Sequence, residues 1–320
     1  MINYKYIDLF KLFFALLIPF LHISFPNNYY IEVVRQYFSR LGVPFFFSCT
    51  GVMLCILMEK GNKQSVCIKY IKRIGYMLFF WTFIYSPLFY KELYYVEYPF
   101  RELLFRTPGF LWYLTAVLFA IIPFVYVQRN ILYFSSIFIY IYGVWYSESY
   151  CWLNGGCLIY QDIFLTTRNG LFFGIPLMCI GELAYKTYDK IKYKAIKMLL
   201  STIVLFSEIT YVRNYVPGGA DTSLYFSLPI FIFYLFINLF AIENLLPINI
   251  LSIAKIKILR KMSSTIYVVQ YGIIITMTSI SSRLEIINWY IPWMTYFVII
   301  LFSLALCTLA KKYLLLNKVI

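Results

Sequence analysis

The first apolar segment of the chain carries the residues best suited to chemistry, namely Asp8, Lys11 and His22. His22 is the only histidine in the sequence, and because imidazole titrates near neutral pH it is the natural candidate for a general base. A helix turns by about 100° per residue, which places His22 within about 20° of Lys11 and about 40° of Asp8 around the axis. This shared stripe predicts a face that is turned toward protein or a water-filled cavity and not toward lipid.

Each of these three residues also has a structural interpretation. Asp8 and Lys11 are three positions apart and could form a local ion pair at the inner membrane surface, whereas the functional hypothesis has Lys11 hold an anionic ligand and Asp8 fix its position. His22 could be a core histidine that is bonded to a neighbouring helix. A multi-histidine metal site is excluded, and there is no zinc-type cysteine spacing, so we expect no metal.

Two further carboxylates fall inside apolar segments. Glu182 lies four residues before Lys186, which is the spacing of an ion pair on one helix face. Glu208 is predicted at a depth similar to that of His22. It could therefore orient His22 or bind an acceptor that carries a hydroxyl group.

The composition predicts that these residues lie in a membrane. The chain has 320 residues, of which 62% are hydrophobic and only 13% are charged, with a formal net charge of +14. A typical soluble domain has about 25% charged residues. A disordered chain, a nucleic-acid-binding protein and most soluble enzymes are therefore excluded.

Ten apolar segments approach or reach the length of about 17–25 residues that a spanning helix needs. Their predicted bounds are 7–25, 41–58, 74–90, 110–127, 130–146, 171–184, 196–212, 223–242, 265–281 and 290–309. We expect an all-α, polytopic integral membrane protein of about ten transmembrane helices, in which residues 1–320 form a single membrane domain.

The distribution of Lys and Arg predicts the orientation of these helices. With the N-terminus inside, 19 of the 28 Lys and Arg residues fall on the inner side, 8 fall on the outer side, and Lys11 lies within the first span. An even number of spans then places both termini in the cytoplasm. Cys151 and Cys157 share the outer loop 147–170, where either a disulfide or two free thiols is expected.

Several motifs resemble the integral-membrane acyltransferase 3 family, which includes O-acetyltransferases of surface polysaccharides. The first is a basic residue, ten positions and a histidine, here Lys11 and His22, with Lys11 where the family usually has Arg. Later segments that look like family motifs are 41–51, 69–74, 109–114, 168–176 and 263–270. Tyr70 and Gln270 depart from them, standing where the family has an arginine and a histidine.

The resemblance implies an acyl donor, often acetyl-CoA, on the cytoplasmic side and a sugar hydroxyl as acceptor. His22 would then act as the base in a direct transfer or form an acyl-histidine intermediate. Lys69, Lys72 and Arg73 would meet the CoA phosphates, although they are also ordinary inner-side charges. Trp112 is predicted beside the donor, with anchoring at the membrane–water interface as an equal alternative. The residues predicted to bind the acceptor are Arg168, Asn169, Glu208 and Tyr267, and Arg168 could instead be a solvated loop arginine.

We therefore expect an O-acyltransferase of the bacterial cytoplasmic membrane that acts on a cell-surface polysaccharide, such as O-antigen, or on its lipid-linked precursor. Its expected partners are the lipid bilayer, acyl-CoA and the carbohydrate, and not nucleic acid. A repeat-unit polymerase is an alternative, but the late outer loops 213–222 and 282–289 are short for one. A transporter or flippase of lipid-linked sugars is another, but two related halves with broken helices are not visible in the sequence.

Overall fold

A computed structural model of the chain describes residues 4–26, 28–94, 110–154, 166–216, 222–245, 253–283 and 290–310. These residues form helices and turns, and no strand occurs among them. Each of the ten apolar segments contains helix within its described part. The prediction of an all-α protein is therefore confirmed.

The first half of the chain begins with an interrupted helix. Its elements are α1 (Lys5–Leu17), α2 (Pro19–His22), α3 (Tyr29–Val33), η1 (Val34–Phe38), η2 (Ser39–Leu41), α4 (Gly42–Lys60), α5 (Lys63–Tyr94), α7 (Trp112–Tyr126), α8 (Arg129–Trp145) and α9 (Glu148–Leu153). The second half consists of η3 (Gly170–Gly174), α11 (Ile175–Thr187), α12 (Lys194–Tyr215), α13 (Leu228–Leu245), α14 (Ile253–Arg283) and α15 (Tyr290–Leu309).

Some of these helices are long and apolar enough to cross a membrane. In the described part of the chain there are five such stretches: Tyr29–Lys60, Lys194–Tyr215, Leu228–Leu245, Ile256–Arg283 and Tyr290–Leu309. The helix Trp112–Tyr126 is apolar but shorter. The protein thus has the helices of a multi-pass membrane protein, while the count of ten spans and the side of the two termini remain predictions.

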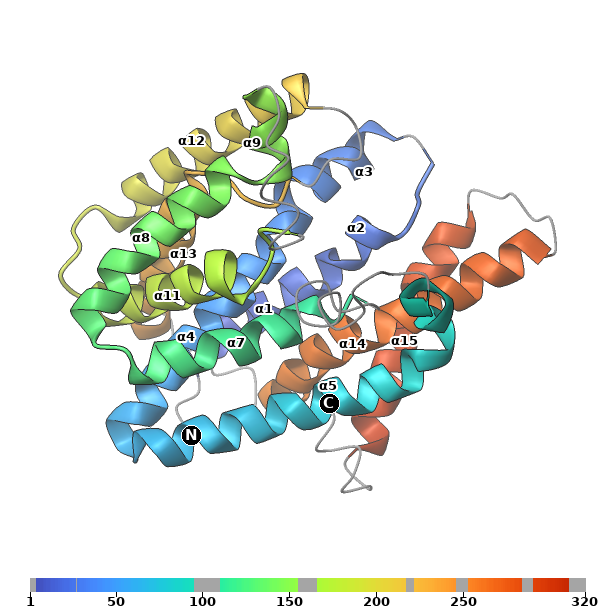
Figure 1. Ribbon diagram of the computed structural model, residues 1–320, viewed down its shortest axis with the longest axis horizontal. Coiled ribbons are helices and arrows are strands. Elements are labelled where there is room, and N and C mark those ends of the chain that lie inside the picture. The colour runs from blue at the N-terminus through green and yellow to red at the C-terminus, as the bar shows by residue number, and fades with distance from the viewer. Residues whose placement is uncertain are drawn as a thin grey trace.

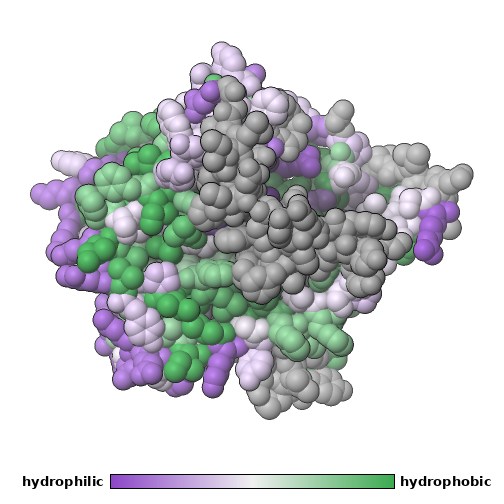
Figure 2. Space-filling view, in the orientation of Figure 1, coloured by the Kyte–Doolittle hydropathy of each residue, from purple (hydrophilic) through white to green (hydrophobic). Residues whose placement is uncertain are grey.

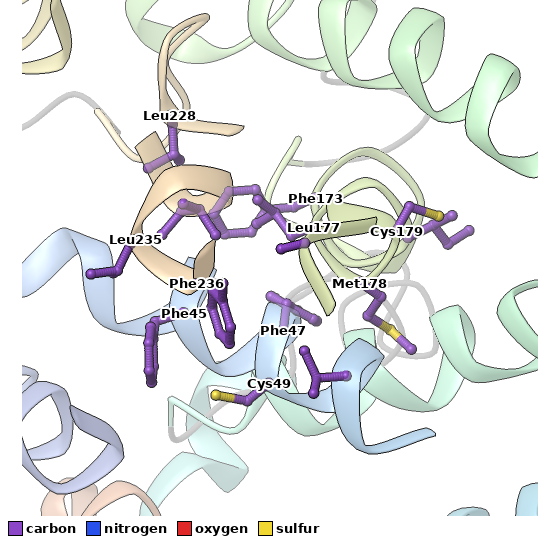
Figure 3. Packing of buried hydrophobic residues seen from close by; sticks show 14 of the residues in the cluster. Phe45, Phe47, Cys49, Phe173, Leu177, Met178, Cys179, Leu228, Leu235 and Phe236 are labelled. Atoms are coloured by element: carbon purple, nitrogen blue, oxygen red, sulfur yellow. The ribbon is translucent and has the colours of Figure 1, made fainter. Parts of the chain in front are cut away.

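Helix α1 lies between two groups of packed helices (Figure 1). On one side α4 packs against α11, and α11 packs against α8 and α13. Phe14 of α1 belongs to this core, whose side chains from α4, α11 and α13 interdigitate in Figure 3. On the other side α14 packs against both α1 and α15, and Ala15 of α1 belongs to that second core. The side chains of α1 therefore reach into both groups.

The crossing of α4 and α11 depends on two glycines. A Cβ atom at Gly51 would overlap the carbonyl oxygen of Met178, and one at Gly181 would overlap that of Ser48. The Ser48 hydroxyl donates a buried hydrogen bond of 2.8 Å to the Leu177 carbonyl oxygen. Small residues let helix backbones approach closely where lipid supplies no hydrophobic drive between helices. The crossing therefore fixes α4, which in turn packs against α1.

Large apolar side chains cover the outer faces of several helices. Phe79 and Phe83 of α5, Phe134 of α8 and Leu301 of α15 are all more than 60% exposed. Figure 2 shows hydrophobic side chains gathered to the left of and below the centre of the visible face, with hydrophilic ones along its left and lower left margins. Exposed aromatic and aliphatic groups on this scale are expected to face lipid.

Candidate active site

The predicted helical stripe is interrupted between Lys11 and His22. Pro19 has no N–H to donate to the preceding turn, and α1 ends at Leu17. The Tyr296 hydroxyl of α15 donates to the Leu16 carbonyl oxygen at 3.1 Å, which satisfies one acceptor next to the interruption. His22 then ends α2, so the C-terminal end of this segment is positioned by the break and by α15.

Near the N-terminal end of α1, Asp8 is only 2% exposed and is paired with two cations. Its two carboxylate oxygens accept from Arg260 of α14, with Nε at 3.1 Å and Nη2 at 2.6 Å. Lys11 Nζ lies 3.6 Å from Asp8 Oδ1, so the predicted local ion pair is present. The Arg260 contact is the stronger of the two, because its planar guanidinium binds both carboxylate oxygens and its N–O distances are shorter.

These three charged residues line one small pocket between α1, α4 and α14. Its lining is Tyr4, Ile7, Asp8, Lys11, Cys49, Val52, Met53 and Arg260. Two cations and one carboxylate give the pocket a formal charge of +1. Its chemistry therefore favours an anionic ligand.

At the other end of the segment, the His22 ring stacks on the ring of Phe110. The two centroids are 3.7 Å apart and the planes are inclined by 18°. Within the described residues, neither ring nitrogen of His22 makes a hydrogen bond. The guanidinium of Arg168, followed by those of Arg40 and Arg35, interacts electrostatically with the imidazole. Arg168 is therefore within electrostatic reach of His22, as Arg40 and Arg35 are.

Phe110 is held in place by residues from three helices. Its backbone has φ of 61°, a left-handed conformation that is uncommon for a bulky residue. The Tyr267 hydroxyl of α14 donates to the Phe110 carbonyl oxygen and accepts from Tyr113 N–H at 3.3 Å. The Tyr113 hydroxyl in turn lies 3.3 Å from Thr50 Oγ1 of α4. Tyr267, which was predicted to bind the acceptor, is connected to His22 through Phe110.

Three other predicted site residues lie together at the start of α7 and η3. The Arg168 guanidinium carbon lies 5.5 Å from the centroid of the Trp112 ring, in a cation–π contact. The Asn169 side-chain oxygen accepts from the N–H groups of Leu171 and Phe172, both at 3.0 Å, and so caps η3. Trp112 and Arg168 were predicted in separate donor and acceptor sites, whereas the structure places them in contact.

Glu208 makes its contacts away from His22. Its carboxylate accepts from the Tyr150 hydroxyl of α9, from Phe226 N–H at 2.7 Å and from both the N–H and the hydroxyl of Ser227. Phe226 and Ser227 directly precede α13, so the carboxylate lies beside the positive end of that helix. Glu208 therefore has a structural role at the start of α13, and its predicted part in the acceptor site remains a prediction.

The remaining predicted residues lie outside the two clusters. Lys69, Lys72 and Arg73 are exposed on α5 and are not among the residues that line the pocket. Glu182 pairs with Lys186 at 2.6 Å, as its spacing predicts, and also with Arg129 at 3.1 Å. Cys151 is buried, and Cys157 lies outside the described residues, so the choice between a disulfide and two thiols stays untested.

Two residues of these clusters were not singled out from the sequence. Arg260 is 252 positions from Asp8, and in the sequence it is one of a run of inner-side basic residues. Phe110 is one of 31 phenylalanines. No local pattern distinguishes either residue, because both act only through contacts between distant segments.

The fold and these two clusters define a helical, multi-pass membrane protein with a histidine at one end of its first apolar segment and a cationic pocket at the other. Residues 4–312 match the profile of the acyltransferase domain that defines the acyltransferase 3 family, and the chain belongs to that family. The family resemblance inferred from the motifs is therefore confirmed.

A curated relative is more distant and longer. A protein of Enterococcus faecalis named "Amino-acid racemase" is 26% identical to the chain over 311 residues, which are 88% of this chain and 42% of that protein. The chain thus spans about two fifths of that relative's length. No solved structure matches the chain.

Proposed function

We propose that the protein transfers an acyl group, acetyl in the simplest case, from cytoplasmic acyl-CoA to a hydroxyl of a cell-surface polysaccharide or its lipid-linked precursor. The observation that carries the proposal is the state of His22 in a chain of this family. Its imidazole has no hydrogen-bond partner among the described residues and lies within the electrostatic reach of Arg168. A general base needs a free nitrogen that its substrate can reach.

The two ends of the first segment suit different parts of the reaction, namely donor binding and catalysis. Lys11 offers a cationic group in the pocket where a phosphate or pyrophosphate of CoA would enter from the cytoplasm, while Arg260 is held by Asp8. Lys69, Lys72 and Arg73 add exposed charge on α5. Lys11 and His22 are eleven residues apart along α1, the break at Pro19 and α2, which at the helical rise corresponds to about 16 Å. The long pantetheine arm of CoA is suited to bridge such a distance and to deliver its thioester near His22.

In the direct reaction, His22 accepts the proton of the acceptor hydroxyl as the oxygen attacks the thioester carbonyl carbon. The new C–O bond forms, the C–S bond breaks, and the proton passes to the CoA thiolate. Arg168 stabilises negative charge that develops near the imidazole. An acyl-histidine intermediate is the alternative, and ping-pong kinetics would distinguish it.

The test compares the native chain with His22→Ala in a bacterial strain from which the gene is deleted. We expect NMR of the isolated polysaccharide to show O-acetyl groups with the native chain and a loss of at least about 100-fold with His22→Ala, since general bases contribute about 10²–10⁴-fold. Ser24→Ala, an exposed polar change two residues away, serves as the matched control and should keep full activity. Equal acetylation by native and His22→Ala proteins contradicts the mechanism.

A further inference from the structure

Gln270 of α14 is a buried amide that the chain itself does not satisfy. Its side chain is 0% exposed, and within the described residues neither Oε1 nor Nε2 has a hydrogen-bond partner. Native proteins pair nearly all buried polar groups, because an unpaired one loses its bonds to water without replacement. An unpaired amide in a membrane-embedded core therefore indicates a missing partner.

The contacts of α14 show which way Gln270 faces. At about 100° per residue, Tyr267 and Arg260 lie about 60° and 80° from Gln270 around the axis. Tyr267 contacts Phe110, and Arg260 contacts Asp8 of α1. Thr265, which contacts Cys307 of α15, and Gly272, which contacts the Tyr85 ring of α5, lie about 140–160° away. Gln270 therefore faces α1 and the start of α7.

The same contacts give the depth of Gln270. Near the start of the first segment, Asp8 pairs with Arg260 of α14. Near its end, His22 stacks on Phe110, which contacts Tyr267 and Tyr271, further along α14. The two helices therefore run in the same direction. Gln270 is ten residues beyond Arg260, or about 15 Å along α14, while His22 is about 21 Å beyond Asp8. The amide thus lies between the cationic pocket and His22, much closer to the level of His22.

We propose that Gln270 binds the thioester of the acyl donor, with its Nε2–H donating to the acyl carbonyl oxygen. This inference rests on the proposed function. As the acceptor oxygen attacks, electrons of the carbonyl double bond move to that oxygen, and a fixed amide donor stabilises the charge that develops there. The amide Oε1 accepts from the N–H of the pantetheine arm that carries the thioester. Both polar atoms of the Gln270 side chain then have hydrogen-bond partners, and the carbonyl carbon of the thioester is held next to His22.

A buried water is the competing occupant, and it makes different predictions for Gln270→Met, which has a similar shape and no amide. If the amide awaits the donor, Gln270→Met removes no contact of the free protein. It should then keep or raise the midpoint of thermal unfolding in detergent and lower kcat about 100-fold, as loss of an oxyanion donor does. If the amide holds only a structural water, the midpoint falls and kcat is unchanged.

Gln270→Glu tests the donor in the opposite direction. A carboxyl buried in this apolar core is protonated, and its O–H can donate to the acyl carbonyl oxygen, so its kcat should lie well above that of Gln270→Met. Thr82→Val is the matched control, because Thr82 Oγ1 is another buried and unpartnered polar atom, on α5. Thr82→Val should transfer acyl groups at the native rate.

The experiment measures transfer of radiolabelled acetyl from acetyl-CoA to the polysaccharide in membranes, together with infrared spectra of a bound donor analogue. The analogue is acetyl-CoA with a methylene in place of the sulfur and ¹³C at the carbonyl. We expect its C=O stretch at lower wavenumber on the native protein than on Gln270→Met. Equal stretches, or equal kcat values, overturn the role of Gln270. If the native chain transfers no acetyl at all, the proposed function fails, and this inference fails with it.

Discussion

Asp8 shows how much of the candidate site a single residue can organise. Its spacing predicted the ion pair with Lys11, and that pair is present at 3.6 Å. Its principal partner, Arg260, comes from a helix near the other end of the chain and binds both carboxylate oxygens. The two cations around Asp8 are therefore not equivalent. Arg260 satisfies the buried carboxylate, and Lys11 is the one that has a cation to offer to a ligand.

This difference predicts opposite effects for two matched substitutions. Arg260→Met leaves the buried Asp8 without its bidentate partner. Breaking a fully buried ion pair lowers the free energy of unfolding by about 3–5 kcal/mol, and because Arg260 is 23% exposed we expect a loss of about 3 kcal/mol. Lys11→Met breaks a longer contact and should cost less than about 1 kcal/mol. It should instead raise KM for acetyl-CoA about tenfold. Thermal unfolding in detergent and initial rates measure the two effects, and equal destabilisation by both would show that Lys11 is only structural.

At the scale of elements, the sequence located the helices better than their ends or their contacts. Each apolar segment contains helix, because continuous apolar runs need their backbone groups paired within the segment. The break at Pro19 was visible as a proline, but the hydroxyl of Tyr296 that satisfies the Leu16 carbonyl was not. The sequence predicted for Glu208 a depth similar to that of His22, but it did not identify the donors to its carboxylate, which come from α9 and the start of α13. Depth and spacing predict which contacts a residue makes within its own helix. They do not identify which other helix packs against it.

The glycine crossing of α4 and α11 gives a prediction for these packed elements. Gly51→Ala puts a Cβ into the Met178 backbone, which cannot rotate away as a side chain could. Because overpacking costs about 1–3 kcal/mol even where side chains can yield, we expect at least about 3 kcal/mol here and little folded protein by size-exclusion chromatography. Gly75→Ala on α5 is the control, since nothing lies within 4 Å of its added Cβ. There the change should be neutral or stabilise the helix by up to about 1 kcal/mol. Normal yield of Gly51→Ala contradicts the crossing.

At the scale of the whole molecule, the distribution of charge and the positions of the candidate residues support one orientation. The inner-side excess of 19 to 8 predicts that Asp8, Lys11 and Arg260 lie near the cytoplasm, where an acyl-CoA would arrive. In that orientation His22, about 16–21 Å further along the first segment, would lie in the outer half, where a sugar acceptor would be presented. The opposite orientation would put the cationic pocket outside the cell and His22 toward the cytoplasm. The proposed reaction therefore depends on the orientation as much as on any residue.

Cysteine labelling in whole cells tests that orientation directly. The six cysteines in the described residues are buried, so they should react slowly with a membrane-impermeant maleimide, and Cys157→Ser removes the seventh. Two exposed positions then receive a single new cysteine in that background. Tyr30→Cys lies between the first segment and α4, on the predicted outer side. Lys60→Cys lies at the end of α4, on the predicted inner side. We expect intact cells to label Tyr30→Cys and not Lys60→Cys, and lysed cells to label both. The unsubstituted Cys157→Ser protein gives the background. The reverse pattern in intact cells would place Lys11 and Arg260 away from cytoplasmic CoA and would remove the donor site from the proposal, even if His22 proved essential.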